Sequence, residues 1–83
     1  MLENREKKKF LSPQEITRDF GVSYQTLNYY TTIGLLHPNR REGNKRLYIA
    51  DEIIKRLKVI GRLKNEGYPL KLISHIINGR KSF

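Results

Sequence analysis

The fold of this chain is decided by one stretch, Ser23-Tyr24-Gln25-Thr26-Leu27-Asn28-Tyr29-Tyr30. Ser23 predicts a helix start, because its hydroxyl oxygen can accept a hydrogen bond from the free amides of a first turn. Gly21, just before it, can take the positive φ that ends a preceding helix. Val22 and Leu27 stand at the two positions of a hydrophobic staple, which fixes the angle at which the chain enters the helix.

The surface of this helix is expected to be polar. Tyr24, Gln25 and Asn28 stand at i, i+1 and i+4, which places them near one exposed face. We expect the helix to end at Ile33, with Gly34 as the residue after its cap. This pattern is typical of the recognition helix of a helix-turn-helix. The alternative is an ordinary surface helix whose polar side chains face water.

A first helix is predicted just upstream. Ser12 is expected to cap it, Pro13 suits its first position, and Glu15 completes a capping box with Ser12. This helix should run from Pro13 to about Asp19, with Ile16 facing inward.

The segment from residue 35 to residue 49 favours a β hairpin, or wing. Pro38 excludes helix, Gly43-Asn44 is a turn signal, and residues 47–49 are short, apolar and β-favouring. We expect one strand near residues 36–37, a tip around residues 41–45 and a return strand near residues 46–48. Four cations stand in this hairpin, namely Arg40, Arg41, Lys45 and Arg46. They repel one another at close range, and phosphates would neutralise them; a solvated loop is the alternative.

Two further helices are expected. Asp51 is predicted to cap the first, which should end near Gly67. Its apolar stripe consists of Ile53, Ile54, Leu57 and Ile60, opposite the cations Lys55, Lys58 and Arg62. The second helix should run from about Pro69 to Asn78. It has two apolar faces, one formed by Leu70, Ile73 and Ile77 and the other by Leu72 and Ile76, so one face is expected to pack against a partner.

The composition bounds the class of protein. The chain has 83 residues, 37% hydrophobic and 30% charged, with a net charge of +9. This predicts one domain over residues 10–79, a flexible basic N-terminal arm over residues 1–9 and a frayed tail over residues 80–83. A pI near 10.1 indicates a polyanionic partner. There is no apolar run of membrane-spanning length and no signal core, so a cytoplasmic protein, associated with the nucleoid, is expected.

Several classes of site are not expected. The chain has no Cys, which excludes disulfides and thiolate metal sites. His37 and His75 have no metal-ligand spacing, so we expect neither metal nor cofactor. No nucleophile–base set, paired carboxylates or phosphate-cradling glycine loop is present, so no enzyme is expected.

With these residues in view, the chain resembles the DNA-binding domain of the MerR family of bacterial transcription regulators. The resemblance covers roughly Leu11 to Ile77. It rests on an ordered set: Gly21-Val22-Ser23, Thr26-Leu27-Asn28-Tyr29-Tyr30, Gly34-Leu35-Leu36, Pro38, Arg40, Arg46, Tyr48, Asp51, Leu57, Ile60, Gly67, Leu70 and Ile73.

The resemblance implies a mostly α, winged helix-turn-helix fold with a small two-stranded β wing and a helix pair as second wing. Family members place the second helix in the major groove of double-stranded DNA and rest the wings on the phosphate backbone. They usually act as homodimers, bend or untwist operator DNA, and act on RNA polymerase indirectly at promoters.

This chain departs from the family pattern at three places. Asn28 stands where the family motif usually has Arg, and Pro69 replaces the small residue that usually opens the last helix. The long dimerising helix and effector domain of typical members do not follow. The chain is therefore expected to be either a truncated piece of a longer protein or a member of a minimal, effector-free branch.

These considerations assign candidate roles. Base or groove contacts are expected from Tyr24, Gln25 and Asn28; Gln and Asn can pair bidentately with adenine. Phosphate contacts are expected from Arg18, Thr26, Tyr29, Arg40, Arg41, Lys45, Arg46, Tyr48, Lys58 and Arg62. Phosphate contacts set register without reading sequence. Each assignment has an alternative: Tyr48 at the edge of the core, Tyr30 rather than Tyr29 at the backbone, and the Lys58 and Arg62 face merely solvated.

Three functions compete. The first is a sequence-specific transcription regulator. The second is an architectural or excisionase-like DNA-binding protein of a mobile element, without a sensing domain. The third is a protein-interaction module that uses the apolar faces of residues 70–77.

Overall fold

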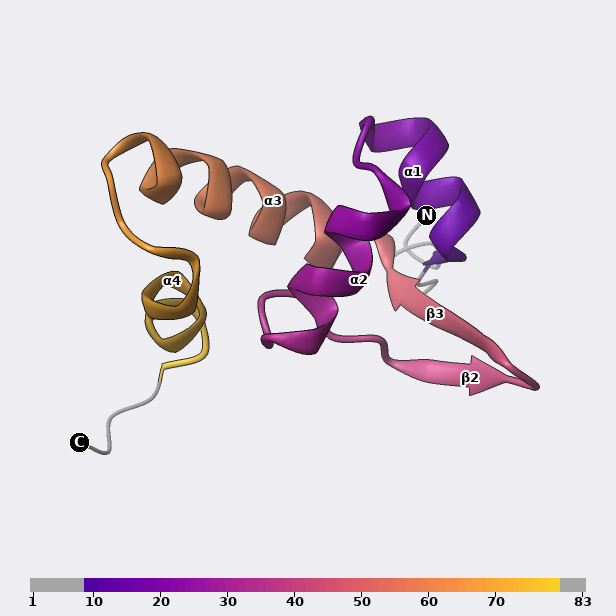
Figure 1. Ribbon diagram of the computed structural model, residues 1–83. Coiled ribbons are helices and arrows are strands. Elements are labelled where there is room, and N and C mark those ends of the chain that lie inside the picture. Colours follow the sequence, from indigo (N-terminus) through magenta and orange to yellow (C-terminus); the bar gives the residue numbers. More distant parts are fainter. Residues whose placement is uncertain (1–8, 80–83) are drawn as a thin grey trace, which may run out of the picture.

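The computed structural model describes residues 9–79, and four helices and three strands follow one another along them (Figure 1). They are β1 (Phe10–Leu11), α1 (Pro13–Phe20), α2 (Tyr24–Thr32), β2 (Arg40–Glu42), β3 (Lys45–Ile49), α3 (Ala50–Asn65) and α4 (Leu70–Ile77). Apart from Lys9, the expected N-terminal arm lies outside the described residues, as does the expected C-terminal tail. The mostly helical, winged helix-turn-helix class is confirmed.

The helix starts predicted from the capping residues are confirmed. Glu15 N–H donates to Ser12 Oγ at 3.2 Å and Ser12 N–H donates to Glu15 Oε1 at 2.8 Å, which is the expected capping box. Ser23 Oγ accepts from Thr26 N–H at 3.0 Å and caps α2. Gly21 takes a φ of 71° at the end of α1, so the turn between the two helices forms as the sequence indicated.

The wing differs from its prediction in the position of its first strand. The prediction of a strand near residues 36–37 is wrong, since no strand forms before Arg40. Leu35 and Leu36 are instead 0% and 1% exposed and pack into the core. β2 begins only at Arg40 and pairs antiparallel with β3, with Arg41 opposite Arg46. The turn between these strands falls at Gly43-Asn44, as predicted.

A third strand, β1, was not expected. It pairs antiparallel with β3, so that the sheet has the order β1-β3-β2. The carbonyl of Lys9 accepts from Ala50 N–H at 2.9 Å, which places Lys9 next to the sheet rather than in the arm. A strand of two residues is too short to produce an alternating pattern, so periodicity does not predict it.

The core lies between the helix-turn-helix, the sheet and the last two helices. Its largest fully buried side chains are Tyr48, Ile16, Leu27, Leu35, Leu36, Ile53 and Ile73. Two predictions for α3 need correction. The helix begins at Ala50 with Ile49 as its cap, so Asp51 lies in the first turn. Ile54 is 38% exposed and does not belong to the buried stripe of Ile53 and Ile60.

Hydrogen bonds join α4 to the end of α2. Ser74 Oγ donates to the carbonyl of Ile33 at 2.7 Å, and Asn78 Nδ2 donates to the carbonyl of Gly34 at 2.9 Å. Arg56 from α3 donates to Asn78 Oδ1 at 2.9 Å and joins the same network. These bonds satisfy carbonyls that a helix end leaves without intrahelical donors.

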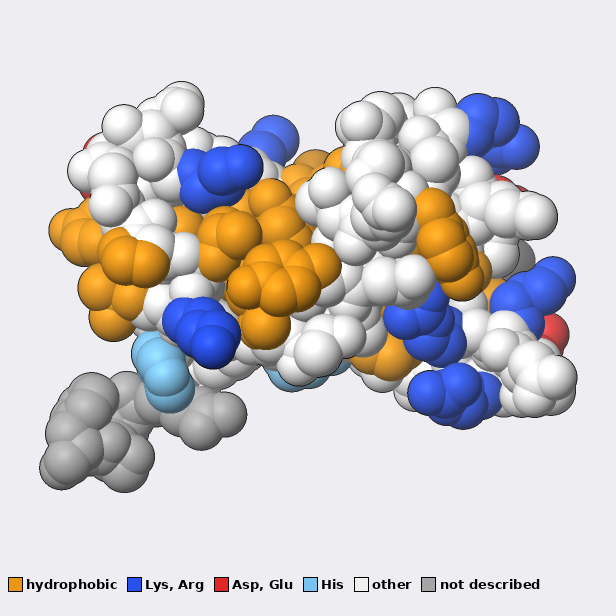
Figure 2. All heavy atoms as spheres, viewed as in Figure 1, with side chains coloured by type: hydrophobic (Ala, Val, Ile, Leu, Met, Phe, Trp, Pro, Cys, Tyr) orange, Lys and Arg blue, Asp and Glu red, His pale blue; other side chains and the backbone are white. Residues whose placement is uncertain are grey.

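The two apolar faces predicted for the last helix are both present. Ile73 is fully buried, with Leu70 and Ile77 packed against the core. Leu72 and Ile76 are 43% and 46% exposed on the other face. Figure 2 shows hydrophobic side chains at the surface at the end of the molecule where α4 lies, and Lys and Arg side chains over the wing at the other end.

Candidate nucleic-acid interface

α2 presents a mostly polar side to the surface because its only aliphatic residue, Leu27, packs into the core. Leu27 and Tyr30 are buried, which leaves Tyr24 and Tyr29 on the surface, at 54% and 47% exposed. Gln25 is also exposed, and Asn28 is half-buried. The prediction that Tyr30 rather than Tyr29 completes the core agrees with this division.

Thr26 is committed locally in this structure. Its Oγ1 accepts from Ser23 Oγ at 2.9 Å, while its backbone N–H donates to the same Ser23 oxygen. Its hydroxyl therefore helps to close the first turn of α2, and it keeps its own proton for a further acceptor.

The wing cations fall on two faces of the hairpin. Arg41 and Arg46 are direct partners across β2 and β3, and like charges directly opposite destabilise a strand pair. Arg40 lies on the other face, because successive strand residues alternate. Its guanidinium lies 5.0 Å from the centroid of the Phe10 ring and 3.7 Å from the carboxylate of Glu42.

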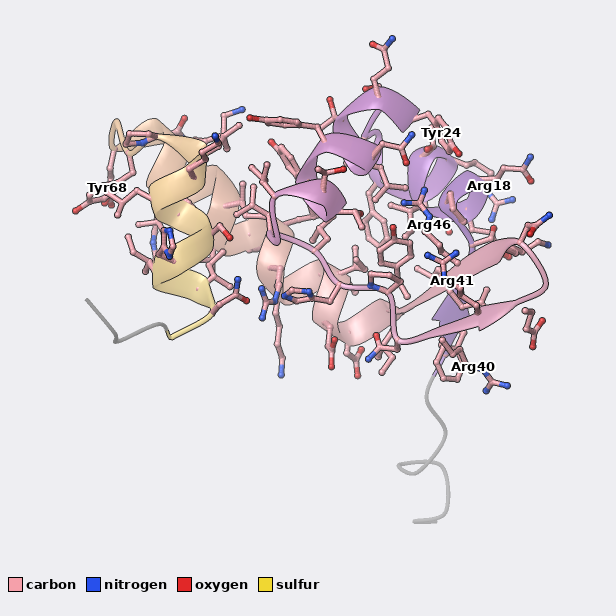
Figure 3. The ribbon with its side chains drawn as sticks, turned by 60° about the horizontal axis from the view of Figure 1, so that its bottom comes forward. Arg18, Tyr24, Arg40, Arg41, Arg46 and Tyr68 are labelled. Atoms are coloured by element: carbon pink, nitrogen blue, oxygen red, sulfur yellow. The ribbon has the colours of Figure 1, made fainter. Side chains whose placement is uncertain are left out.

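One groove brings the helix-turn-helix and the wing together. It has a volume of about 730 Å³ and is lined by Ser12, Pro13, Gln14, Thr17, Arg18, Tyr24, Asn44, Lys45 and Arg46. Three of these residues are cationic, from α1 and from β3. Figure 3 shows Arg18, Tyr24, Arg41 and Arg46 gathered on this side of the molecule, whereas Tyr68 lies at the α4 end.

Arg18 is the cation that α1 contributes. It is exposed, and its Nε donates to Asp19 Oδ1 at 2.8 Å. This hydrogen bond lowers the pKa of the Asp19 carboxyl below its ordinary value and raises that of Arg18. The pair is open to solvent, so it adds little to stability.

Two side-chain contacts join the wing strand β3 to α2. Arg46 Nη2 donates to Asn28 Oδ1 at 2.6 Å. The hydroxyl of Tyr48 is 2.8 Å from Thr31 Oγ1, which itself donates to the carbonyl of Leu27. The wing strand and α2 are thus held side by side by polar groups as well as by the core.

Tyr48 lies at the core side of the wing. Its side chain is 0% exposed and its hydroxyl is 2.8 Å from Thr31 Oγ1, a position that fits the core-edge alternative for this residue. Lys58 and Arg62 are exposed on α3, but neither lines the groove between α1, α2 and the wing.

Some groove residues were not singled out from the sequence. Gln14 and Asn44 line the groove, as does Thr17, whose buried hydroxyl has no hydrogen-bond partner among residues 9–79. From the sequence, Asn44 is part of a turn signal and Gln14 lies in the first turn of a helix. Neither position indicates that the two residues share a surface, because that depends on how the wing lies relative to α1.

In residues 9–79, no group of three or more His, Cys, Asp or Glu side chains is placed to hold a metal ion. Over the same span, no helix combines the length and apolar character needed to cross a bilayer.

Comparison with known proteins gives a family. Residues 11–80 match the family described as MerR HTH family regulatory protein. The chain is 33% identical over 73 residues to the multidrug-efflux transporter 2 regulator of Bacillus subtilis (strain 168). That match covers 88% of this chain and 27% of the relative, so the chain spans about a quarter of the relative's length. No solved structure matches significantly. The chain, by its matched residues and its winged helix-turn-helix fold, belongs to the MerR family of helix-turn-helix regulatory proteins.

Proposed function

We propose that this chain binds double-stranded DNA in a sequence-specific manner and acts in transcription regulation. The observation that carries the proposal is the shared groove, in which cations from α1 and the wing border the polar start of α2. A net charge of +9 on 83 residues supplies the long-range attraction for a polyanion. The family is one of regulatory proteins, which supports binding rather than catalysis.

In this proposal α2 enters the major groove. Tyr24 and Gln25 are exposed and Asn28 is half-buried on its polar side, so these side chains are the proposed groove contacts. Thr26 and Tyr29 flank them and are proposed to donate hydroxyl protons to the backbone. Side chains of this kind read base edges or position the helix on phosphates.

The phosphate contacts come from the cations around the groove. Arg18, Lys45 and Arg46 line it, and Arg41 stands beside Arg46 on the same face of the wing. Arg40, on the opposite face, is proposed to reach a phosphate only at the outer edge of the wing. Lys58 and Arg62 are proposed contacts of the second wing, further along the duplex.

Dimerisation is also part of the proposal. The exposed face of Leu72 and Ile76 belongs to the second wing, and regulators of this family usually act as homodimers. Bending or untwisting of the operator and an indirect effect on RNA polymerase would follow from two such domains acting on one site. The architectural alternative differs in predicting a bend without any effect on transcription.

A titration with duplex at several salt concentrations tests the proposal. If about six phosphates are neutralised, log K should fall with log salt at a slope of about −5. Arg41→Ala should weaken binding to all sequences alike and make the slope shallower by about one. Lys71→Ala removes a positive charge at an exposed position of α4 outside the proposed contacts, so it is the matched control and should leave the slope unchanged. Absence of binding at low salt, or a slope near zero, would refute the proposal.

A further inference from the structure

The contact between the wing and the recognition helix fixes the orientation of Asn28. Arg46 Nη2 donates to Asn28 Oδ1 at 2.6 Å in a part-buried position. A guanidinium carries only donors, so the atom of the carboxamide that faces the wing must be the oxygen. The two N–H groups of Asn28 are then turned away from Arg46. The chemistry of the partner thus settles an amide orientation that geometry alone leaves ambiguous.

Arg46 also contacts the ring of Tyr48. Its guanidinium carbon lies 5.8 Å from the centroid of the Tyr48 ring, and that ring is buried. The Tyr48 hydroxyl bonds to Thr31, which stands about one turn after Asn28 on the same helix. Two parallel links therefore join β3 to α2. A side chain fixed in this way before binding loses less conformational freedom when a ligand arrives.

This arrangement changes what Asn28 can read. Bidentate pairing with adenine uses both ends of the carboxamide, because the oxygen accepts from N6 and the nitrogen donates to N7. Here the oxygen is turned toward the wing. The oxygen keeps a second lone pair, but a donor such as adenine N6 that approached it would lie beside the Arg46 guanidinium, which itself carries only donors. The unopposed hydrogen-bonding groups of Asn28 are its two N–H donors. Guanine presents two acceptors, O6 and N7, at the same edge.

Resting on the proposed function, we infer that Asn28, oriented by Arg46, selects guanine rather than adenine in the major groove. Arg46 is then a specificity-determining positioning residue as well as a phosphate contact. Its role in sequence choice passes through Asn28, and its charge is not what carries that role.

The test is a selection from a random duplex library, with sequencing of the bound fraction. The wild type should prefer guanine at one position, and Asn28→Ala should lose that preference by at least about fivefold. Arg46→Lys keeps the charge but replaces the planar guanidinium, whose Nη2 reaches Asn28 Oδ1, by an ammonium of different length and shape. It should lose the same preference at the same position while its total affinity for duplex falls much less.

Arg56→Lys is the matched control, because Arg56 is not among the proposed DNA contacts. Arg56 lies on α3, and its guanidinium donates to the Leu35 carbonyl and to Asn78 rather than to Asn28. Arg56→Lys should select the same sequence as the wild type. In the free protein, the side-chain amide resonances of Asn28 should move in Arg46→Lys and stay in place in Arg56→Lys. Thermal unfolding of each variant shows whether it is folded.

The outcomes separate the inference from the proposed function. A wild type that binds no duplex, or binds without base preference, refutes the proposed function and the inference with it. Binding with an unchanged guanine preference in Arg46→Lys overturns the inference alone. So does an adenine at the position that depends on Asn28, or Asn28 amide resonances that ignore Arg46→Lys.

Discussion

Ser74→Ala tests the hydrogen bonds that fasten α4 to the end of α2. Ser74 is 8% exposed, and its hydroxyl donates to the carbonyl of Ile33 at 2.7 Å. Leaving this part-buried carbonyl without its donor costs about 1–3 kcal/mol of stability. Alanine is the better helix former and returns roughly 0.5 kcal/mol. The net loss should be about 1.5 kcal/mol, which lowers Tm by roughly 6–12 °C for a domain of this size.

The assay is thermal and urea unfolding of the wild type and the variant, followed by circular dichroism. Lys71→Ala, at an exposed position of the same helix, is the control and should change stability by no more than about 0.5 kcal/mol. Asn78→Ala extends the test, since Asn78 Nδ2 is 3.3 Å from Ser74 Oγ and donates to Gly34. The two effects should be non-additive, because both residues belong to one network.

A Ser74→Ala variant that is at least as stable as the wild type would refute this account. The Ile33 carbonyl would then be satisfied in another way, and the position of α4 would depend on apolar packing and on the Asn78 hydrogen bond. Additive effects of Ser74→Ala and Asn78→Ala would show that the two side chains act separately.

Three further substitutions test other parts of the fold. Gly34→Ala should lower the free energy of unfolding by about 1–2 kcal/mol, because alanine is strained at a φ of +85°. The loss should be larger still, because the new Cβ would lie 3.1 Å from Ser74 Oγ. Gly43→Ala, with open space around it, should show the backbone strain alone in the same unfolding assay. Ser12→Ala should lower the free energy of unfolding by about 1 kcal/mol through loss of the capping box, and Ser12→Asp should restore most of it. Arg18→Ala should raise the pKa of Asp19 toward its ordinary value in an NMR titration. Since the folded-state pKa of Asp19 is depressed, the small contribution of the pair is present at neutral pH and lost as pH falls through that pKa; an unchanged Asp19 titration in Arg18→Ala would contradict the assigned cause.

Local signals in the sequence were sufficient where one or two residues determine the backbone. Ser12, Glu15 and Ser23 cap helices through bonds three residues away, so the starts of α1 and α2 could be read directly. The turn at Gly43-Asn44 could also be predicted, because these two residue types favour a turn by themselves. The two apolar faces of α4 followed from helical periodicity, and the structure buries Ile73 and exposes Leu72 as that pattern requires.

Local sequence signals were insufficient where the environment of a residue depends on a partner far along the chain. Leu35 and Leu36 read equally well as strand or core, and only packing assigned them to the core. β1 exists because β3 offers it a partner, not because Phe10 and Leu11 favour a strand strongly. Tyr48 carries the same aromatic ring whether it faces phosphate or Thr31, so its burial could not be read from its neighbours.

The sequence by itself determined the order of the helices, the charge of the wing and the polar residues of α2. Those features depend on spacing and on side-chain type, which are local. The tertiary structure decided which groups meet: Arg46 with Asn28, Ser74 with Ile33, and Arg18 with the wing across one groove. These contacts join residues far apart along the chain, and their geometry is set by how the core packs, a property that no single stretch contains.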